Sequence, residues 1–276
     1  MEIAGPIGVF DSGYGGLSVL SELQKEFPNY DFIYLGDNAR SPYGGRSFDA
    51  VYRYTLEAVE KLFEMGSHLV ILACNTASAK ALRTIQQRNL PLIDPGRRVL
   101  GVIRPSVEVV GNYSKTGYIG VLGTVGTVLS NSYPLELKKL FPKLIVEQEA
   151  CPMWVPLVEN EEYLTDGAAY FVKKNLDNIF KRQPLIDTLI LGCTHYPLLL
   201  PLIEKFVPKE VKVISQGAIV ATSLRNYFIR HPEMDNKCSK SGTQTYYSTE
   251  NCEKFSNAAS LFLGKKVEAL QIKLGC

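Results

Sequence analysis

Two cysteines occupy matching positions in the sequence, and their surroundings suit acid–base chemistry. Cys74 lies in LVILACNTASA (69–79) and Cys193 in TLILGCTHYPL (188–198), and each follows an apolar run and precedes small polar residues. A cysteine between a strand and a helix is well placed to ionise, because a helix N-terminus lowers the thiol pKa from its reference value of ~8.5. A single such cysteine could be a small buried hydrophobic residue, but the matched pair favours a chemical role.

Two thiols on opposite sides of one ligand carbon could invert a stereocentre. One thiolate would remove a proton from the carbon, and the opposite thiol would return a proton to the other face. Nucleophilic catalysis is the alternative, but it needs only one thiol with an orienting base. His195 follows Cys193 by two residues, whereas no histidine has the same relation to Cys74. A cysteine–histidine hydrolase would leave Cys74 unexplained, so the pair favours acid–base catalysis.

Other polar stretches also follow apolar runs: DSGYGG, GDNARSPYGG, CNTAS, GTVGT and CTHYP. In α/β sheets, ligands bind beyond the carboxyl ends of the strands. Backbone N–H groups and the helix dipole at DSGYGG and GTVGT favour an anion. Neither stretch is a nucleotide fingerprint, because GYGGLS lacks the third glycine of GxGxxG and GxxxxGK[ST] is absent. The sequence therefore favours a carboxylate or phosphate ligand over a dinucleotide.

Short apolar runs that alternate with longer helical patterns must position these residues. The Val, Ile and Leu content of the runs is typical of buried parallel strands covered by helices. Their alternation with helices predicts an α/β fold. The predicted strands are 6–10, 31–36, 69–74, 99–103, 118–123, 144–148, 188–193, 211–215 and 243–249; the predicted helices are 16–27, 47–65, 77–89, 127–140, 163–181, 198–206 and 252–264. The polar stretch HPEMDNKCSKSG (231–242) predicts an exposed loop.

An internal repeat indicates two similar α/β halves. IGVFDSGYGGLS (7–18) aligns with IGVLGTVGTVLS (119–130) at an offset of 112 residues, and the cysteine stretches repeat later in the same order. Strand exits in all βα units favour similar small residues, which is the alternative explanation, but several matches in one order favour duplication. We expect one domain from 1–98 with 215–276 and a second from 99–214. Mainly parallel sheets would then flank an active site in the interdomain cleft.

Composition excludes several classes of function. The 276 residues are 46% apolar and 21% charged, with a net charge of +2 and no basic stripe, so we expect no nucleic-acid partner. No apolar run reaches the ~20 residues of a membrane span, and the N-terminus lacks the pattern of a signal peptide. The six cysteines form no CxxC pair and the three histidines give no ligand spacing. We expect reduced thiols in the cytoplasm and no metal site.

Five motifs in order give the chain a family resemblance: FDSGYGGLSVL, YLGDNARSPYGGRS, ACNTASA, CPMWVPLVE and LGCTHYPLL. The chain resembles the glutamate racemases of the aspartate/glutamate racemase family from about residue 7 to 200, and more loosely in the tail. The resemblance implies two α/β domains with the site between them. It also implies an isomerase that makes D-glutamate for peptidoglycan, and hence for cell-wall biogenesis and cell shape, without a cofactor. We further expect a homodimer.

The resemblance also assigns roles to individual residues. Cys74 and Cys193 would be the catalytic bases, with Asp11 and His195 tuning them, and Glu159 could be a similar carboxylate or a plain surface residue. The residues lining the substrate would be Asp11, Ser12, Tyr43, Gly44, Asn75, Thr76, Thr194 and His195. Hydroxyl, amide and backbone N–H groups can hold carboxylates, and Asp11 can accept from the ammonium. Alternatively, Ser12 and Thr76 cap helices, and Tyr43 and Gly44 shape a turn.

Some features depart from the family pattern or leave alternatives open. The segment 90–106 is longer and more basic than expected, with Arg104 near the domain crossing, and Tyr14 and Trp154 are bulkier than usual. We expect these differences to affect the hinge or the pocket size. An aspartate racemase is the alternative enzyme, although His195 favours glutamate. A non-catalytic anion-binding protein is the alternative outside enzymes, and the two intact cysteines argue against it.

Overall fold

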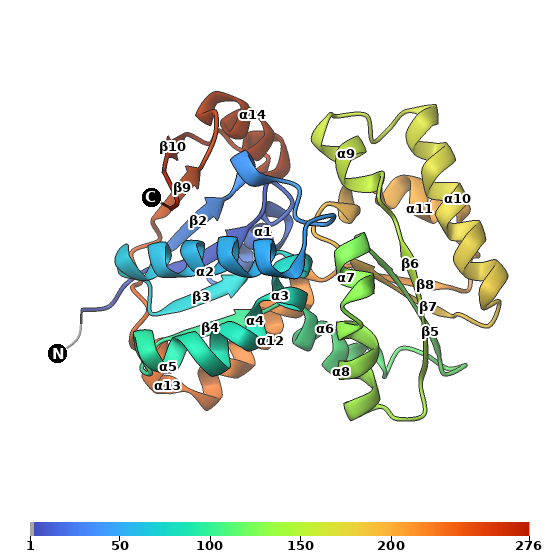
Figure 1. The fold of residues 1–276 in the computed structure, drawn as a ribbon, viewed down its shortest axis with the longest axis horizontal. Helices are drawn as coiled ribbons and strands as arrows, with labels where there is room; N and C mark the ends of the chain where they lie inside the picture. The colour runs from blue at the N-terminus through green and yellow to red at the C-terminus, as the bar shows by residue number, and fades with distance from the viewer. Residues whose placement is uncertain (1–2, 276) are drawn as a thin grey trace.

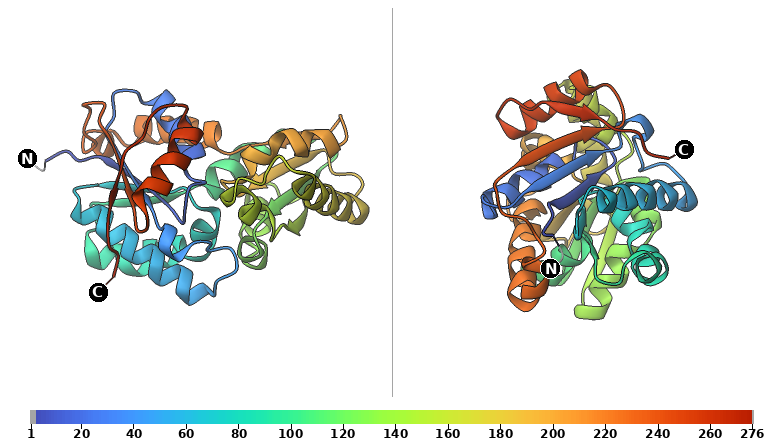
Figure 2. Two further views of the ribbon diagram at one scale, coloured as in Figure 1. Left: turned by 90° about the horizontal axis from the view of Figure 1, so that it is seen from above. Right: turned by 90° about the vertical axis from the view of Figure 1, so that its left-hand side faces the viewer.

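The computed structural model describes residues 3–275, and its strands form two separate sheets (Figures 1 and 2). The strands are β1 (Ile7–Asp11), β2 (Phe32–Gly36), β3 (Leu69–Leu72), β4 (Arg98–Gly101), β5 (Tyr118–Gly123), β6 (Ile145–Ala150), β7 (Thr188–Gly192), β8 (Lys212–Ile214), β9 (Gln244–Ser248) and β10 (Ala269–Gln271). The larger sheet has six strands in the order β10-β9-β2-β1-β3-β4, and the smaller has four in the order β6-β5-β7-β8. All these pairings are parallel, which confirms the predicted α/β fold class.

The two sheets share a local strand order. In the larger sheet β1 lies between β2 and β3, and in the smaller sheet β5 lies between β6 and β7. Therefore β3 and β7 are equivalent strands, and each leads into one of the two cysteines, Cys74 or Cys193. The register pairs Asp11 with Gly36 in one sheet and Gly123 with Gly192 in the other. The residues after these strands thus emerge at one edge of each sheet, where α/β proteins bind ligands.

Helices cover both faces of each sheet, which explains the apolar strands. The helices are α1 (Leu17–Glu26), α2 (Phe48–Glu64), α3 (Asn75–Lys80), α4 (Leu82–Thr84), α5 (Leu90–Ile93), α6 (Ile103–Val110), α7 (Val125–Leu129), α8 (Ser132–Leu140), α9 (Trp154–Glu159), α10 (Asp166–Arg182), α11 (Leu200–Phe206), α12 (Gly217–Arg230), α13 (Pro232–Asp235) and α14 (Cys252–Leu263). Ile7 and Val9 of β1 belong to a core with α1, α12 and α14, and Phe10 belongs to one with α2 and α3. On the smaller sheet, α9, α10 and α11 cover one face and α6 and α8 the other.

The chain passes between the sheets at two places. β4 pairs with β3 in the larger sheet, whereas α6, which begins at Ile103, packs on the smaller sheet. β8 pairs with β7 in the smaller sheet, whereas α12, which begins at Gly217, packs against α1 in the other half. Segments from both ends of the chain therefore share one half of the molecule (Figure 1). We propose that the two sheets are the centres of two domains that meet at Val102 and at 215–216.

The structure corrects the prediction of an exposed loop over 231–242. Pro232–Asp235 forms the short helix α13, and Met234 and Cys238 are buried in the core beneath α12. The backbone of this segment also bonds to the start of the chain, because the Gly5 N–H donates to Lys237 O and the Gly5 carbonyl accepts from the Ser239 N–H. Two apolar side chains four positions apart, Met234 and Cys238, are thus buried in a stretch whose other residues are exposed or partly exposed.

Two predicted helices are interrupted. The segment 77–89 contains α3, α4 and a π turn over Ile85–Asn89, and the segment 127–140 contains α7 and α8. Asn131 separates the latter two with a φ of 54°, a left-handed conformation that asparagine tolerates. Shorter 3₁₀ turns cover Asn38–Arg40 and Tyr196–Leu199. Cys276, expected to be a reduced thiol, lies outside the described residues.

Candidate active site

Cys74 lies at the junction between β3 and α3. Its sulfur accepts a hydrogen bond from the Ala77 N–H at 3.5 Å, so the side chain caps the helix, and the Ser12 hydroxyl lies 3.5 Å away. The side chain is buried. Burial and the nearby Asp11 carboxylate raise the pKa of Cys74 to about 12, although the bonds from Ala77 and Ser12 oppose the rise. In this environment Cys74 is a protonated thiol, which is a proton donor.

Cys193 follows β7 and has a different partner. Its sulfur lies 3.8 Å from His195 Nδ1, and His195 Nε2 lies 3.3 Å from Glu159 Oε1. Ser41 Oγ donates to the same Glu159 oxygen at 2.9 Å. Burial would lower the pKa of His195, but its bonds to the Cys193 sulfur and the Glu159 carboxylate outweigh burial and raise it to about 10. This half of the site therefore places a sulfur beside an imidazole that a carboxylate holds.

Glu159 is therefore a partner of the site and not a plain surface residue. It ends α9, and its side chain is 18% exposed. Burial would raise its pKa, but the hydrogen bond and charge of His195 outweigh that effect and lower it. The sequence left Glu159 open between these two readings, because nothing in VPLVE shows that α9 packs beside the CTH turn.

Asp11 and Thr194 connect the two halves. Thr194 Oγ1, from the smaller sheet, donates to Asp11 Oδ2 at 3.2 Å, and the Ser18 hydroxyl donates to Thr194 O at 2.9 Å. Asp11 is completely buried, and its other oxygen accepts from the Gly13 N–H. Burial raises the pKa of Asp11, while the charge of His195 and the backbone N–H groups oppose the rise. Ser12 thus contacts Cys74, and Asp11 contacts Thr194, the residue that follows Cys193.

Thr76 makes a second connection between the halves. Its hydroxyl lies 2.9 Å from that of Thr124, which follows β5 in the smaller sheet. Thr124 also caps α7 by accepting from the Thr127 N–H at 3.2 Å. The structure thus adds Thr124 to the predicted set. Its signal was present in the sequence, because GTVGT aligns with DSGYGG in the internal repeat.

Tyr43 and Gly44 belong to a loop that reaches the same junction. The buried Tyr43 hydroxyl donates to Asp37 Oδ2, and Asp37 also accepts from Arg40 Nε at 2.7 Å. Gly44 O accepts from the Gly126 N–H at 2.7 Å, at the start of α7. A Cβ atom at Gly44 would lie 2.8 Å from Thr124 Cβ, so this approach requires glycine. The Tyr43 side chain holds the loop, and the Gly44 backbone meets the other half.

Asn75 has both side-chain atoms engaged by the protein. Its Nδ2 donates to Gln216 Oε1 at 2.7 Å, and its Oδ1 accepts from the Tyr133 hydroxyl at 2.7 Å. Both partners are buried, and sequence analysis missed both. No signal singled them out, since Tyr133 lies inside a helical pattern and Gln216 lies in a stretch between predicted elements.

Tyr14 and Trp154, the two bulky departures, both pack in hydrophobic cores. Trp154 is fully buried in the core of the smaller half, where its Nε1 donates to Asn175 Oδ1 at 3.0 Å. The Tyr14 ring lies against Phe255 of α14, with 5.6 Å between ring centroids. Their bulk is therefore accommodated by the cores.

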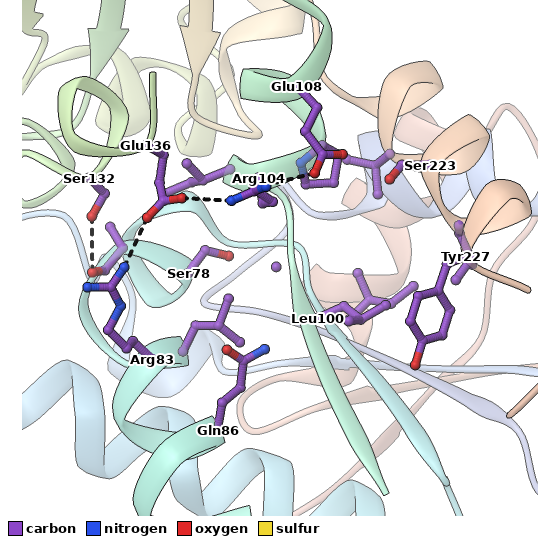
Figure 3. A pocket seen from close by; sticks show the side chains of 18 of the residues that line it. Ser78, Arg83, Gln86, Leu100, Arg104, Glu108, Ser132, Glu136, Ser223 and Tyr227 are labelled. Carbon is purple, nitrogen blue, oxygen red and sulfur yellow. Dashed lines mark hydrogen bonds and ion pairs between the residues drawn. The ribbon is translucent and has the colours of Figure 1, made fainter. Parts of the chain in front are cut away.

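Two cavities lie near the junction of the halves, and neither borders both cysteines. The larger, about 540 Å³, is lined by residues of α4, α6, α8 and α12 that include an ion-pair cluster of Arg83, Arg104, Glu108 and Glu136 (Figure 3). Arg104, which the sequence placed near the crossing, is part of this cluster. The smaller, about 320 Å³, borders Cys193, Thr194 and Gln216. The larger cavity therefore lies beside the hinge, the place where the chain passes between the halves at Val102 and at 215–216. It borders neither Cys74 nor Cys193.

Within 3–275, no helix is long and apolar enough to cross a membrane. In the same part of the chain, no group of three or more His, Cys, Asp or Glu side chains could hold a metal ion. The remaining described cysteines are Cys151 and Cys238, which are buried, and the half-buried Cys252. None of these three contacts Asp11, Ser12 or His195 in the hydrogen bonds found.

Comparison with known proteins gives a consistent family. The Asp/Glu/Hydantoin racemase family matches residues 16–224. A glutamate racemase from Ruegeria sp. (strain TM1040) is 38% identical over 271 residues, which cover 95% of this chain and 97% of that protein. The crystal structure of the glutamate racemase isoform RacE1 from Bacillus anthracis is similar with a TM-score of 0.89 and 35% identity, over 98% of both chains.

A second solved structure adds a ligand complex. The glutamate racemase from Francisella tularensis, crystallised with D-glutamate, is similar with a TM-score of 0.85 and 30% identity, over 99% of this chain and 98% of that one. These matches extend over nearly the whole chain and include both sheets and the hinge. They confirm the resemblance found in the five motifs. The chain therefore belongs to the Asp/Glu/Hydantoin racemase family and is an amino-acid racemase.

Proposed function

We propose that this racemase interconverts L- and D-glutamate with Cys74 and Cys193 as opposed acid and base. The observation that carries the proposal is that the two cysteines follow equivalent strands, with Ser12 in contact with Cys74 and Asp11 in contact with Thr194, the neighbour of Cys193. The relatives named as glutamate racemases, and the complex of one of them with D-glutamate, support the choice of substrate.

The two cysteine environments suit opposite starting roles. Cys193, whose sulfur lies beside His195, removes the α-proton of L-glutamate. Cys74, which burial and Asp11 keep protonated, then gives its proton to the opposite face of the carbanion and forms D-glutamate. This turnover leaves a Cys74 thiolate and a Cys193 thiol, the state that accepts D-glutamate for the reverse reaction. One proton is removed from the carbon and one is returned, so each turnover is balanced.

The remaining predicted residues form a binding site for an amino acid with two carboxylates. Ser12, Thr76 and Thr194 supply hydroxyl groups, and Gly44 and Asn75 supply backbone N–H groups. Such donors bind carboxylates well. The buried Asp11 carboxylate accepts from the substrate ammonium, which restores a charge partner to a group that burial otherwise disfavours. His195 acts mainly on the adjacent sulfur.

The proposal has further parts that concern the cell. The proton transfers described need only the protein's own side chains, so we propose catalysis without a cofactor or metal. We also propose that the product supplies peptidoglycan synthesis in the cytoplasm and that the enzyme is a homodimer. Growth of a deletion strain only with added D-glutamate would support the cellular role. Sedimentation of the purified protein measures the oligomeric state.

A direct assay tests the activity. Purified protein is incubated with L-glutamate or L-aspartate, without added cofactor, and optical rotation is followed. The account expects the rotation of glutamate to decay to zero, because enantiomers have equal free energies, and dialysis against a chelator to leave the rate unchanged. Faster turnover of aspartate would indicate an aspartate racemase, and loss of activity after dialysis would contradict metal-free catalysis.

A further inference from the structure

A buried hydrogen-bond network joins the two chain crossings. Gln216 lies at the second crossing, between β8 and α12. Its Nε2 donates to Ser106 Oγ at 2.8 Å and lies 3.3 Å from Val102 O, and both of these groups belong to the first crossing. Ser106 Oγ in turn donates to Val102 O at 3.0 Å. One side chain therefore joins the two chain segments that cross between the halves.

The same glutamine also reaches the residue that follows Cys74. Its Oε1 accepts from Asn75 Nδ2, and its Nε2 donates to the Tyr133 hydroxyl, each at 2.7 Å. Tyr133 closes the ring of contacts by donating to Asn75 Oδ1. Asn75 begins α3 in the larger half, whereas Tyr133 lies in α8, whose core includes β5 and β7. The network therefore bonds the Cys74 turn to the half that carries Cys193.

Burial makes this network resistant to rearrangement. Tyr133 is 0%, Asn75 2% and Gln216 4% exposed. A buried amide or hydroxyl that loses its partner is left unsatisfied, because water does not replace it. Rotation of one half about the crossings would separate Gln216 and Tyr133 from Asn75 or from Val102. The network thus opposes changes in the angle between the sheets.

We propose that Gln216, acting with Tyr133 through Asn75, is a positioning residue that holds Cys74 opposite Cys193 during racemisation. This inference rests on the proposed two-thiol mechanism. Two bases that must reach one carbon from opposite faces depend on the angle between the halves that carry them. A misplacement of about 1 Å can reduce a rate by about 10²-fold, so a bond at the hinge can control the chemical step.

Three variants separate positioning from ordinary structural support. Gln216→Met keeps the length of the side chain but removes its donors and acceptor, and Tyr133→Phe removes only the bridging hydroxyl. Asn175→Leu is the control, because Asn175 is also a buried amide, bonded to Trp154 and Glu149 within the smaller half. Each variant is measured for Tm and for kcat and KM in both directions.

The proposal expects kcat to fall by about 10²-fold in Gln216→Met, and by a smaller factor in Tyr133→Phe, with KM changed less than kcat. Asn175→Leu should lower Tm and leave kcat near that of the unmodified enzyme. If Gln216→Met and Tyr133→Phe lower Tm as the control does but keep kcat, the network only stabilises the fold and the proposal is wrong. Tyr133→Phe keeps the test decisive if Gln216→Met fails to fold.

Hydrogen exchange separates this proposal from the proposed function. Backbone exchange is measured in 99–110 and 211–220 of the unmodified enzyme and the variants. We expect both segments to exchange faster in Gln216→Met than in the unmodified enzyme. We expect neither segment to exchange faster in Asn175→Leu. If the unmodified enzyme fails to racemise glutamate, the proposed function is wrong, and the exchange data still test the hinge. Unchanged exchange in both segments would overturn the role of the network.

Discussion

His195 and Glu159 make the environments of the two cysteines unequal. The Cys74 sulfur has a hydroxyl and a backbone N–H as partners, whereas the Cys193 sulfur has an imidazole that a carboxylate holds. The equivalent strands therefore place the same residue type among two different sets of hydrogen-bond partners.

Glu159→Gln tests the electrostatic part of this arrangement. Burial would lower the pKa of His195, but its bonds to the Cys193 sulfur and to the Glu159 carboxylate raise it to about 10. The charged imidazolium is present below that pKa and is lost as pH rises through it. Removing the Glu159 carboxylate should lower the pKa of His195, so the imidazolium should lose its proton at a lower pH. We expect the alkaline decline of kcat/KM for L-glutamate to begin at lower pH in Glu159→Gln.

The pH profile of Glu162→Gln is the control for this measurement. Glu162 is an exposed carboxylate just beyond the end of α9, so its replacement removes the same charge at a short distance along the chain. Its profile should match that of the unmodified enzyme. An unshifted profile in Glu159→Gln would mean that this carboxylate does not control the charge of His195.

At the scale of elements, the DSGYGG turn brings the two strand ends together. A Cβ atom at Gly15 would lie 2.4 Å from His195 Nδ1 and 2.5 Å from Thr194 Oγ1. We expect Gly15→Ala to displace the CTH turn and reduce kcat by about 10²-fold. Gly45→Ala is the matched control, because a Cβ atom there meets nothing within 4 Å. Racemisation assays and circular dichroism of both variants check the expectation; a fully active Gly15→Ala would contradict this close packing.

The sequence predicted the elements well where a local pattern determines them. The apolar runs and the internal repeat predicted two parallel sheets. The position of Cys74 and Cys193 after apolar runs singled them out as candidate site residues. Contacts between distant elements had no such pattern. Glu159 beside His195, Thr124 beside Thr76, and Gln216 beside Asn75 depend on how the halves meet. Met234 was missed because its neighbours in sequence are polar, although its side chain belongs to the core.

At the scale of the whole molecule, an ion-pair cluster complements the buried hinge network. Glu136 of α8 contacts Arg83 of α4, Arg104 of α6 and Lys139, and its side chain is 17% exposed (Figure 3). Burial would raise the pKa of Glu136, but its pairs with Lys139 and Arg104 outweigh burial and lower it. The stabilisation is therefore present above the unfolded-state pKa and is lost as pH falls through the folded-state value.

Glu136→Gln should lower the free energy of unfolding at neutral pH by about 1 kcal/mol, and the loss should shrink at high salt and at acidic pH. Denaturant unfolding at low and high salt measures this. Glu64→Gln is the control, because Glu64 makes one exposed pair with Lys61 within α2. Equal effects of the two substitutions at low salt would show that the cluster adds nothing beyond a single surface pair.

Exchange of the substrate α-proton in heavy water tests the two-thiol mechanism most directly. Positioned proton transfer is worth roughly 10²–10⁴-fold, so Cys74→Ser and Cys193→Ser should each nearly abolish racemisation, while Cys238→Ser, a change at a buried cysteine in the core of the larger half, should not. Cys74→Ser keeps the base for L-glutamate and should exchange only that enantiomer slowly, and Cys193→Ser should exchange only D-glutamate. Near-normal racemisation by either serine variant would contradict the mechanism, and the opposite enantiomer preference would reverse the assignment of faces.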